Sequence, residues 1–99
     1  MNLPRKIKIG TVWYHVVLDA SCLRAGHMGY IDYDKKSIQI AECSTKTGRA
    51  FKDKDIEDTF WHEVIHAILH DMGSTLRNNE KFVTAFSSRL TKAINSARF

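Results

Sequence analysis

The sequence has no apolar run long enough to cross a bilayer, and its N-terminus lacks the apolar stretch of a signal peptide. Both absences lead us to expect a cytoplasmic protein with no membrane partner. Cysteine is also scarce. Cys22 and Cys43 lie far apart in the sequence, in no C-x-x-C or zinc-ribbon spacing. This spacing argues against a disulfide framework and a cysteine-ligated zinc site, and we expect both thiols to be reduced.

Internal repeats and low-complexity segments are absent as well, which leaves an ordinary globular composition. Of the 99 residues, 43% are hydrophobic and 26% are charged. Because this length supports one core but not two, we expect a single domain over residues 1–99. The net charge of +4 is compatible with nucleic acid or an acidic partner. It indicates neither, since there is no helix-turn-helix signal and no aromatic–basic RNA motif.

The first half of the chain alternates between apolar and polar residues, whereas the second half has helical spacing. The alternation predicts strands at Lys6–Ile9, Val12–Leu18, Gly29–Tyr33 and Ser37–Ala41. Residues 19–27 have no clear period and are expected to form a connection. Both faces of the second strand are partly apolar, which is compatible with cover on both sides. Helices are expected at about 54–72 and 79–95. Strands followed by helices predict an α+β fold, a small antiparallel-rich sheet with two packed helices.

Each predicted helix has an apolar face and end signals. The face of the first helix is expected to comprise Ile56, Phe60, Val64, Ala67 and Ile68. The face of the second helix is expected to comprise Phe82, Phe86, Leu90, Ala93 and Ile94. Acidic residues crowd the start of the first helix, where an aspartate can cap it. Gly73 is expected to end that helix, and Asn78 to cap the second.

The most informative pattern is the H-E-x-x-H pentad His62-Glu63-Val64-Ile65-His66, in the middle of the first predicted helix. Residues four apart lie about 40° apart around a helix and one turn apart along it, so both imidazoles can converge on one metal ion. Glu63 falls about 100° from His62, within reach of a water on that metal. With five histidines and four glutamates in the chain, a chance match is expected about once in a hundred sequences. The pentad therefore predicts a zinc-hydrolase arrangement.

A catalytic zinc site normally takes a third protein ligand. In a continuous helix His70 lies about 12 Å along the axis from His62, too far for one ion to bind both. Asp71 fails for the same reason, since no glycine precedes Met72 to break the helix. Glu80 is better placed, because the segment between His66 and Glu80 is long enough for the chain to turn and start a second helix running back. We expect Glu80 to be the third ligand and His70 to be structural.

The pentad followed by Asn79-Glu80-Lys81-Phe82-Val83 resembles the zincin metallopeptidases of the gluzincin type, in which a glutamate is the third ligand. A closer resemblance is to very small single-domain metallopeptidases encoded by phages and prophages, and it covers about Lys6 to Leu90. Those proteins share a strand pair, a Gly-x-Ile-Asp strand (here residues 29–32), an Ile-x-Ile strand, the motif helix and a closing helix. The metzincin extension is absent, because Leu69 and Met72 replace its glycine and its third histidine.

The resemblance implies a minimal zincin-like domain and a zinc-dependent metallopeptidase. One Zn²⁺ would be held by His62, His66 and Glu80, with Glu63 as the general base. The substrate is expected to be a peptide or protein, which could pair along the sheet edge with the Ser37–Ala41 strand or its loop continuation. A protein partner could supply specificity. If the chain is phage-encoded, it is expected in the host cytoplasm.

In the resembled family a tyrosine or histidine usually stabilises the oxyanion, and no residue of this sequence matches that donor. The candidates for that role are His27, Tyr30, Tyr33 and His70. The spacing to Glu80 is also shorter than in large gluzincins. Catalysis is therefore a weaker expectation than metal binding.

Two other functions stay open. One is a basic, non-catalytic binding module with a structural or degenerate zinc site, bound to nucleic acid or a protein partner. Its phosphate-binding surface would combine two groups of basic residues, Arg5, Lys6 and Lys8 with Arg89, Lys92 and Arg98. The other is an interaction protein that retains a degenerate zincin site, against which the intact Glu63 argues.

Overall fold

The computed structural model describes residues 3–19, 28–44 and 47–99. Its elements in chain order are β1 (Lys6–Ile9), β2 (Val12–Asp19), β3 (Gly29–Asp32), β4 (Ser37–Ala41), α1 (Asp53–Asp71) and α2 (Glu80–Ser96). The predicted α+β fold is confirmed, and all six elements begin and end within one residue of their predicted bounds. Cys22, His27 and the rest of the predicted connection at 20–27 lie outside the described residues.

The four strands form one mixed sheet in the order β1-β2-β4-β3. β1 pairs with β2 and β3 pairs with β4 in antiparallel fashion, while β2 and β4 are parallel. With two antiparallel ladders out of three, the sheet is antiparallel-rich as predicted. However, β4 lies between β2 and β3. The expectation that Ser37–Ala41 offers an edge to a substrate is therefore wrong, and the strand at that end of the sheet is β3.

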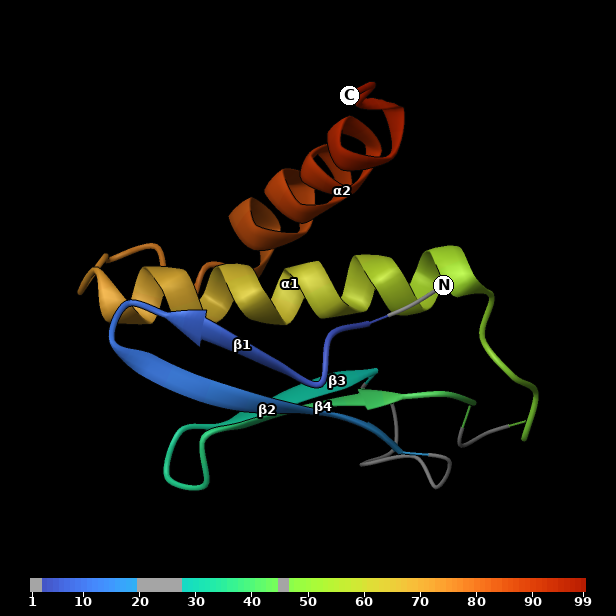
Figure 1. Ribbon diagram of the computed structural model, residues 1–99, viewed down its shortest axis with the longest axis horizontal. Coiled ribbons are helices and arrows are strands. Elements are labelled where there is room, and N and C mark those ends of the chain that lie inside the picture. The colour runs from blue at the N-terminus through green and yellow to red at the C-terminus, as the bar shows by residue number, and fades with distance from the viewer. Residues whose placement is uncertain (1–2, 20–27, 45–46) are drawn as a thin grey trace.

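The molecule has three layers, in which α1 is the middle one (Figure 1). α1 crosses one face of the sheet and contacts β1, β3 and β4. α2 packs on the opposite side of α1 and, among the described residues, contacts no strand. Both sides of α1 are consequently buried, and the side chains between its two contact faces remain available for a site.

Burial on α1 follows from this middle position. Phe60, Val64 and Ala67 pack against the sheet, while Ile65 and Leu69 pack with Val83 of α2. The predicted face is confirmed for Phe60, Val64 and Ala67. It is wrong for Ile68, which is 41% exposed, because the second buried face turns toward α2 through Ile65 and Leu69 instead.

The predicted face of α2 is confirmed in part, because Phe82 and Leu90 pack, partly buried, against the cluster of Ile65, Leu69 and Val83. Val83, Ser87 and Thr91 are buried, whereas Phe86 is 49% and Ile94 42% exposed. Small side chains let the two helix backbones approach closely. Ser87 and Thr91 also satisfy their hydroxyls within the helix, by donating to the carbonyls of Thr84 (3.2 Å) and Ser87 (2.8 Å). Phe86 and Ile94 therefore lie beside the contact between α1 and α2 rather than within it.

The helix ends confirm one expectation and correct two. Gly73 follows α1 with a φ of 67°, the left-handed conformation that ends a helix. The N-cap of α1 is Lys52, whose side chain makes no capping hydrogen bond, so the expected aspartate cap is wrong. The cap of α2 is Asn79 rather than Asn78, and its Oδ1 accepts a hydrogen bond from the Phe82 backbone N–H (3.0 Å). Glu80 is thereby the first residue of α2.

The sheet face that points away from α1 is exposed along β2. Trp13, His15 and Val17 of β2 are exposed on it, so the suggested cover on both sides of this strand is wrong. Lys6 and Lys8 of β1 lie over the Trp13 ring, with Nζ atoms 4.8 and 5.9 Å from its centroid. In the described part of the chain, no helix has the length and apolarity that a membrane span requires.

The turn between β1 and β2 is fitted to the end of α1. Gly10 has a φ of 61°, and a Cβ built there would lie 2.3 Å from Oδ1 of Asp71. This position therefore needs glycine for two reasons, the left-handed backbone and the close approach of the Asp71 carboxylate.

We predict that Gly10→Ala destabilises the protein by about 2–3 kcal/mol, because left-handed strain costs about 1–2 kcal/mol and the exposed Asp71 carboxylate must also move aside. Gly48→Ala is the matched control, since Gly48 has a φ of 70° but no atom within 4 Å of the built Cβ. That variant should cost only about 1–2 kcal/mol. Urea denaturation measures both. Equal losses in the two variants would show that the contact between Gly10 and Asp71 does not constrain the turn.

Candidate metal centre

The two histidines of the pentad lie on adjacent turns of α1, which runs unbroken from Asp53 to Asp71. Their rings are 4.8 Å apart between centroids, and their Nε2 atoms are 3.2 Å apart. Both side chains are mostly buried, with exposures of 20% for His62 and 13% for His66. The predicted convergence of the two imidazoles is therefore present.

Glu80 completes this group from the first turn of α2. Its Oε2 lies 3.0 Å from Nε2 of His62, and its Oε1 lies 2.8 Å from Nε2 of His66. The chain reaches this point because α1 ends at Gly73 and Asn79 caps a new helix that packs back on α1. Among the described residues, His62, His66 and Glu80 form the one group of three or more side chains with suitable donor spacing for a metal ion.

The proton positions on His66 follow from its neighbours. Its Nδ1 lies 2.7 Å from the backbone oxygen of Arg77, which can only accept, so Nδ1 carries a proton. In a neutral imidazole Nε2 then presents a lone pair, and this lone pair faces the carboxylate of Glu80 and Nε2 of His62. A metal ion or a shared proton among these atoms removes the repulsion.

A metal ion fits this arrangement better than a proton does. A single proton bridges one pair of atoms, whereas a metal ion accepts a lone pair from all three residues. Ligand atoms about 2.1 Å from a tetrahedral zinc ion lie about 3.4 Å apart. The donor atoms of His62, His66 and Glu80 are 2.8–3.2 Å apart, so these separations would have to widen by only a few tenths of an ångström to bind zinc. A histidine whose other ring nitrogen donates to a backbone carbonyl is also typical of metal ligands.

The ionisation of His62 suits the same role. Burial lowers the pKa of His62, the negative charge of Glu80 opposes this effect, and His66 lowers the pKa further whenever it is protonated. The imidazole is thus held toward its neutral form, the form that binds metals.

Glu63 lies beside the three donors, on the side of α1 that faces β3. A Cβ built on Gly29 would come 2.9 Å from Oε2 of Glu63 and 2.7 Å from Cγ2 of Thr59. The absence of a side chain at Gly29 is therefore what lets the Glu63 carboxylate lie against the strand. Burial raises the pKa of Glu63 to about 7, with His66 opposing and Glu80 adding to the rise. A carboxyl group with such a pKa can exchange protons near neutral pH.

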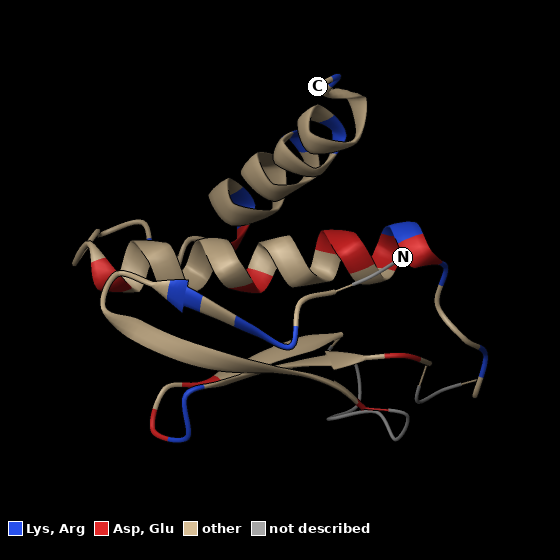
Figure 2. Cartoon of the chain, in the orientation of Figure 1, with Lys and Arg blue, Asp and Glu red and all other residues tan. Residues whose placement is uncertain are grey.

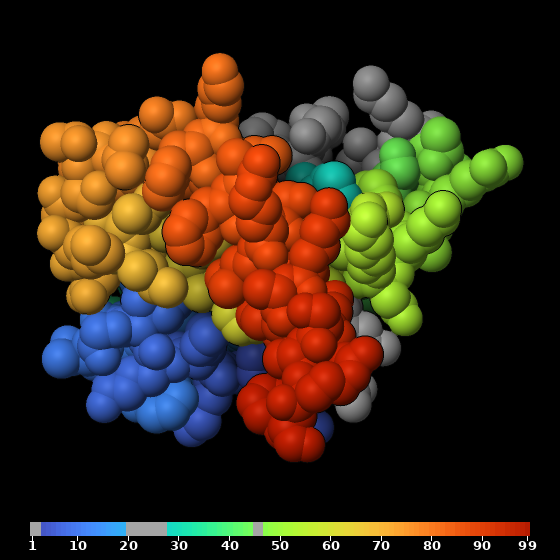
Figure 3. All heavy atoms as spheres, turned by 90° about the horizontal axis from the view of Figure 1, so that it is seen from above, coloured from blue at the N-terminus to red at the C-terminus, as the bar shows by residue number. Residues whose placement is uncertain are grey.

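A cavity of roughly 570 Å³ opens in front of these side chains. It is lined by Met28, Gly29, Tyr30, Ile31, His62, Glu63, His66 and Glu80. In Figure 3 part of β3 is visible in teal between the start of α2 and the first turns of α1. The site is thus bounded by both helices and by the strand at the end of the sheet.

The backbone of β3 adds polar groups to this cavity. The Ala41 N–H donates to the Met28 carbonyl (2.8 Å), and hydrogen-bonded pairs alternate along an antiparallel ladder. The N–H and C=O groups of Gly29 and Ile31 therefore point away from β4, toward the open edge. An extended peptide can pair with such an edge.

The other candidates from the sequence lie elsewhere or have other contacts. His70 stacks on Tyr33 with ring centroids 4.0 Å apart, as expected for a structural residue. Asp71 lies against Gly10. Tyr30 lines the cavity, but by strand alternation its side chain lies on the face opposite Ile31, which points toward α1. With His27 outside the described residues, the oxyanion donor stays unassigned.

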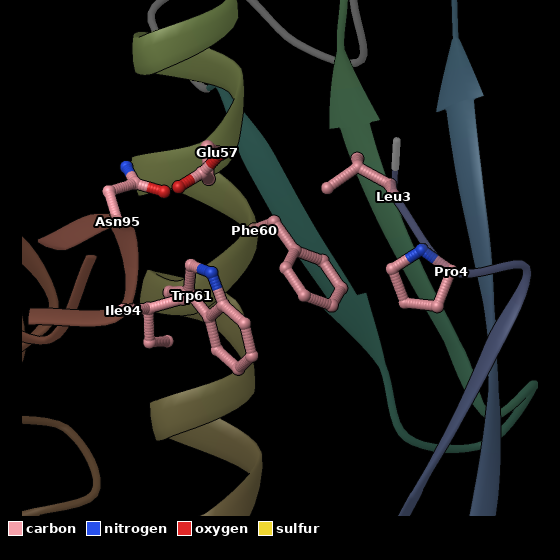
Figure 4. A pocket seen from close by; sticks show the side chains of 7 residues that line it. All are labelled: Leu3, Pro4, Glu57, Phe60, Trp61, Ile94 and Asn95. Carbon is pink, nitrogen blue, oxygen red and sulfur yellow. The ribbon is translucent and has the colours of Figure 1, made fainter. Parts of the chain in front are cut away.

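A second hollow, of roughly 170 Å³, lies between the start of the chain and both helices (Figure 4). One carboxylate oxygen of Glu57 is buried there without a hydrogen-bond partner among the described residues. The side chain of Asn95 points toward it (Figure 4). Exchanging the oxygen and nitrogen positions of this amide would present its NH₂ group to the carboxylate instead of its oxygen. This hollow contains no second metal-binding side chain and stays separate from the site.

Two contributors to the site were missed by the sequence analysis. The Arg77 carbonyl could not be found from residue types, because a backbone acceptor leaves no trace in them. Gly29 did leave a signal, since glycine inside a strand often marks the close approach of another group. Comparison with protein-family models, curated proteins and solved structures found no match to this chain.

The raised pKa of Glu63 predicts a pH-dependent stability for the metal-free protein. Between pH 4.5 and about 7 the folded state keeps the Glu63 proton, whereas the unfolded state has released it. Folding stability is therefore lost as pH rises through this range. Glu63→Gln removes the titration. Between pH 4.5 and 8, the free energy of unfolding of this variant should rise relative to that of wild type by at most about 3 kcal/mol.

Urea denaturation in the presence of a chelator, at pH 5 and pH 8, measures this difference. Glu57→Gln is the control, because it removes another carboxylate of α1. If wild type and Glu63→Gln differ in free energy of unfolding by the same amount at both pH values, the result would contradict the burial of the Glu63 carboxyl.

Proposed function

We propose that this chain is a zinc-dependent metallopeptidase that hydrolyses peptide bonds. The observation that carries the proposal is the convergence of two imidazole nitrogens and a carboxylate, with the proton of His66 held on its far nitrogen by Arg77. His62, His66 and Glu80 would hold one Zn²⁺, and three protein ligands leave a coordination position open for chemistry.

A zinc ion bound there would supply Lewis-acid activation of a water molecule and of the scissile carbonyl. The protein's own contribution begins with Glu63. Its carboxylate accepts the proton of the attacking water and passes it to the departing amine, so one group acts first as base and then as acid.

The open edge of β3 supports a peptide as the substrate. Backbone groups of Gly29 and Ile31 at this edge would pair with an extended chain and orient its scissile bond beside Glu63. Because pairing of this kind involves the backbone, it does not by itself select a sequence. We therefore include in the proposal a protein partner that contributes specificity.

The likeness to gluzincins and to small phage-encoded metallopeptidases belongs to this proposal too. It rests on the pentad and on Glu80, the glutamate that follows its last histidine at the start of the next helix. The proposed compartment is the cytoplasm, that of the host if the chain is phage-encoded.

A basic binding module is the second candidate, supported by the exposed Trp13 ring between Lys6 and Lys8. Aromatic and basic groups together suit single-stranded nucleic acid. Against it, Arg89 and Lys92 lie on α2, beyond α1 from the sheet, so the two basic groups do not form one surface (Figure 2). Lysines on an edge strand also serve to prevent strand pairing with other molecules. Salt-sensitive DNA binding without hydrolysis would favour this module.

The ligand assignment predicts different effects for two substitutions. Glu80→Ala removes a donor and should weaken zinc binding by more than about 100-fold, beyond the loss typical of a supporting contact. His70→Ala removes only the ring stacked on Tyr33 and should leave the zinc affinity near that of wild type. Competition with a chromophoric chelator measures both affinities. The reverse order would show that His70 is the ligand.

The general-base assignment predicts a separation of metal binding from activity. Glu63→Gln should retain one zinc ion per chain, because Glu63 is not among the three donors, and should lose about 10²–10⁴-fold in kcat. Zinc content by mass spectrometry and cleavage of a peptide mixture are the two readouts. A zinc-loaded Glu63→Gln protein with wild-type activity would exclude this base.

A further inference from the structure

A smaller hollow lies on the other side of His62 from the cavity that contains Glu63. Its volume is roughly 250 Å³, and it is lined by Asp58, Thr59, His62, Thr84, Ser87 and Ser88. His62 lines both spaces, so the hollow and the cavity adjoin at this side chain. The hollow is adjacent to the donor group, and His62 is the one assigned donor that lines it.

The polar groups of this hollow include several hydrogen-bond acceptors. Thr59 and Ser87 donate their hydroxyl protons to backbone carbonyls of their own helices, at 2.8 and 3.2 Å. Their oxygens retain lone pairs for another group. The carboxylate of Asp58 has no ion pair or hydrogen bond within the described part of the chain. The carboxylate of Asp58 and the lone pairs of these hydroxyl groups suit a ligand that is rich in N–H groups.

The charge around the hollow has one sign. No lysine or arginine lines it. Asp58 belongs to the acidic first turns of α1, visible as the red segments in Figure 2. In α2 the residues that line the hollow are hydroxyl-bearing, and the basic residues of that helix do not line it. A cation in this hollow would consequently meet the carboxylate of Asp58, with no lysine or arginine among the lining residues to compete for it.

The distances match a long basic side chain. Asp58 lies one helical turn before His62, and Thr84 lies one turn after Glu80, so the far wall is about 6 Å from the donor group along each helix. An extended lysine or arginine side chain has about this length. A substrate residue next to the scissile bond could thus place its charged end at Asp58.

We propose that this hollow is a specificity subsite in which Asp58 binds the lysine or arginine side chain of a residue flanking the scissile bond. This inference rests on the proposed peptidase function and adds a substrate class to it. Asp58 is then the specificity-determining residue, and the hydroxyl groups of the hollow accept the remaining N–H groups. A charge-assisted hydrogen bond of this kind discriminates against neutral side chains.

The first test measures binding without catalysis. Ethylguanidinium is titrated into the protein, and amide NMR shifts are followed, with tetramethylammonium as the ionic-strength control. Saturable shifts are expected at Asp58, Thr84 and Ser88. Asp58→Asn should weaken this binding about tenfold or more. Asp55→Asn removes the same charge from the same helix outside the hollow and should leave binding unchanged. Absence of these shifts, or equal binding by Asp58→Asn, overturns the subsite.

The second test uses zinc-loaded protein and a peptide library derived from a whole proteome. Wild type and Asp55→Asn should cleave with lysine or arginine enriched at one position flanking the scissile bond, and Asp58→Asn should lose this enrichment while keeping its zinc. Cleavage without a basic preference, or with one that Asp58→Asn retains, overturns the subsite and leaves the peptidase proposal standing. Absence of any cleavage by zinc-loaded wild type overturns both.

Discussion

The hydrogen bond between Nδ1 of His66 and the carbonyl of Arg77 is the contact on which the site's chemistry depends. A backbone carbonyl cannot donate, so this bond assigns the ring proton to Nδ1 and turns the lone pair of Nε2 toward His62 and Glu80. Without it, His66 could protonate on Nε2 and form an ordinary hydrogen bond to the carboxylate. The connection between α1 and α2 therefore does more than join two helices, because one of its carbonyls selects the metal-binding tautomer.

The layered fold explains why such a group can exist in a chain of 99 residues. α1 is buried by the sheet on one side and by α2 on the other, which leaves a flank of the helix between the two contacts. His62, Glu63 and His66 lie on this flank, partly shielded from water by β3 and by the first turn of α2. The same shielding lowers the pKa of His62 and raises that of Glu63. Packing and site electrostatics thus have one origin.

The parts of this arrangement that follow from local rules were predictable. The spacing of His62 and His66 determines their convergence wherever a helix is continuous, and the length of chain before Glu80 permits a return to the same place. The face of α2 was predictable only in part, since hydrophobicity correctly selects Phe82 but also selects the exposed Phe86, whereas close helix approach requires the small residues Ser87 and Thr91. The expectation that β4 lies at the edge of the sheet was wrong for a similar reason. The parallel contact of β2 with β4 depends on a long connection that has no local pattern.

The most direct test is a crystal structure of the protein loaded with zinc, with the metal identified by anomalous scattering. We predict one ion per chain, bound by Nε2 of His62, Nε2 of His66 and the carboxylate of Glu80, with a non-protein oxygen as a further ligand. Failure of the folded protein to take up zinc would contradict it. So would an ion held by four protein ligands, or one bound without Glu80.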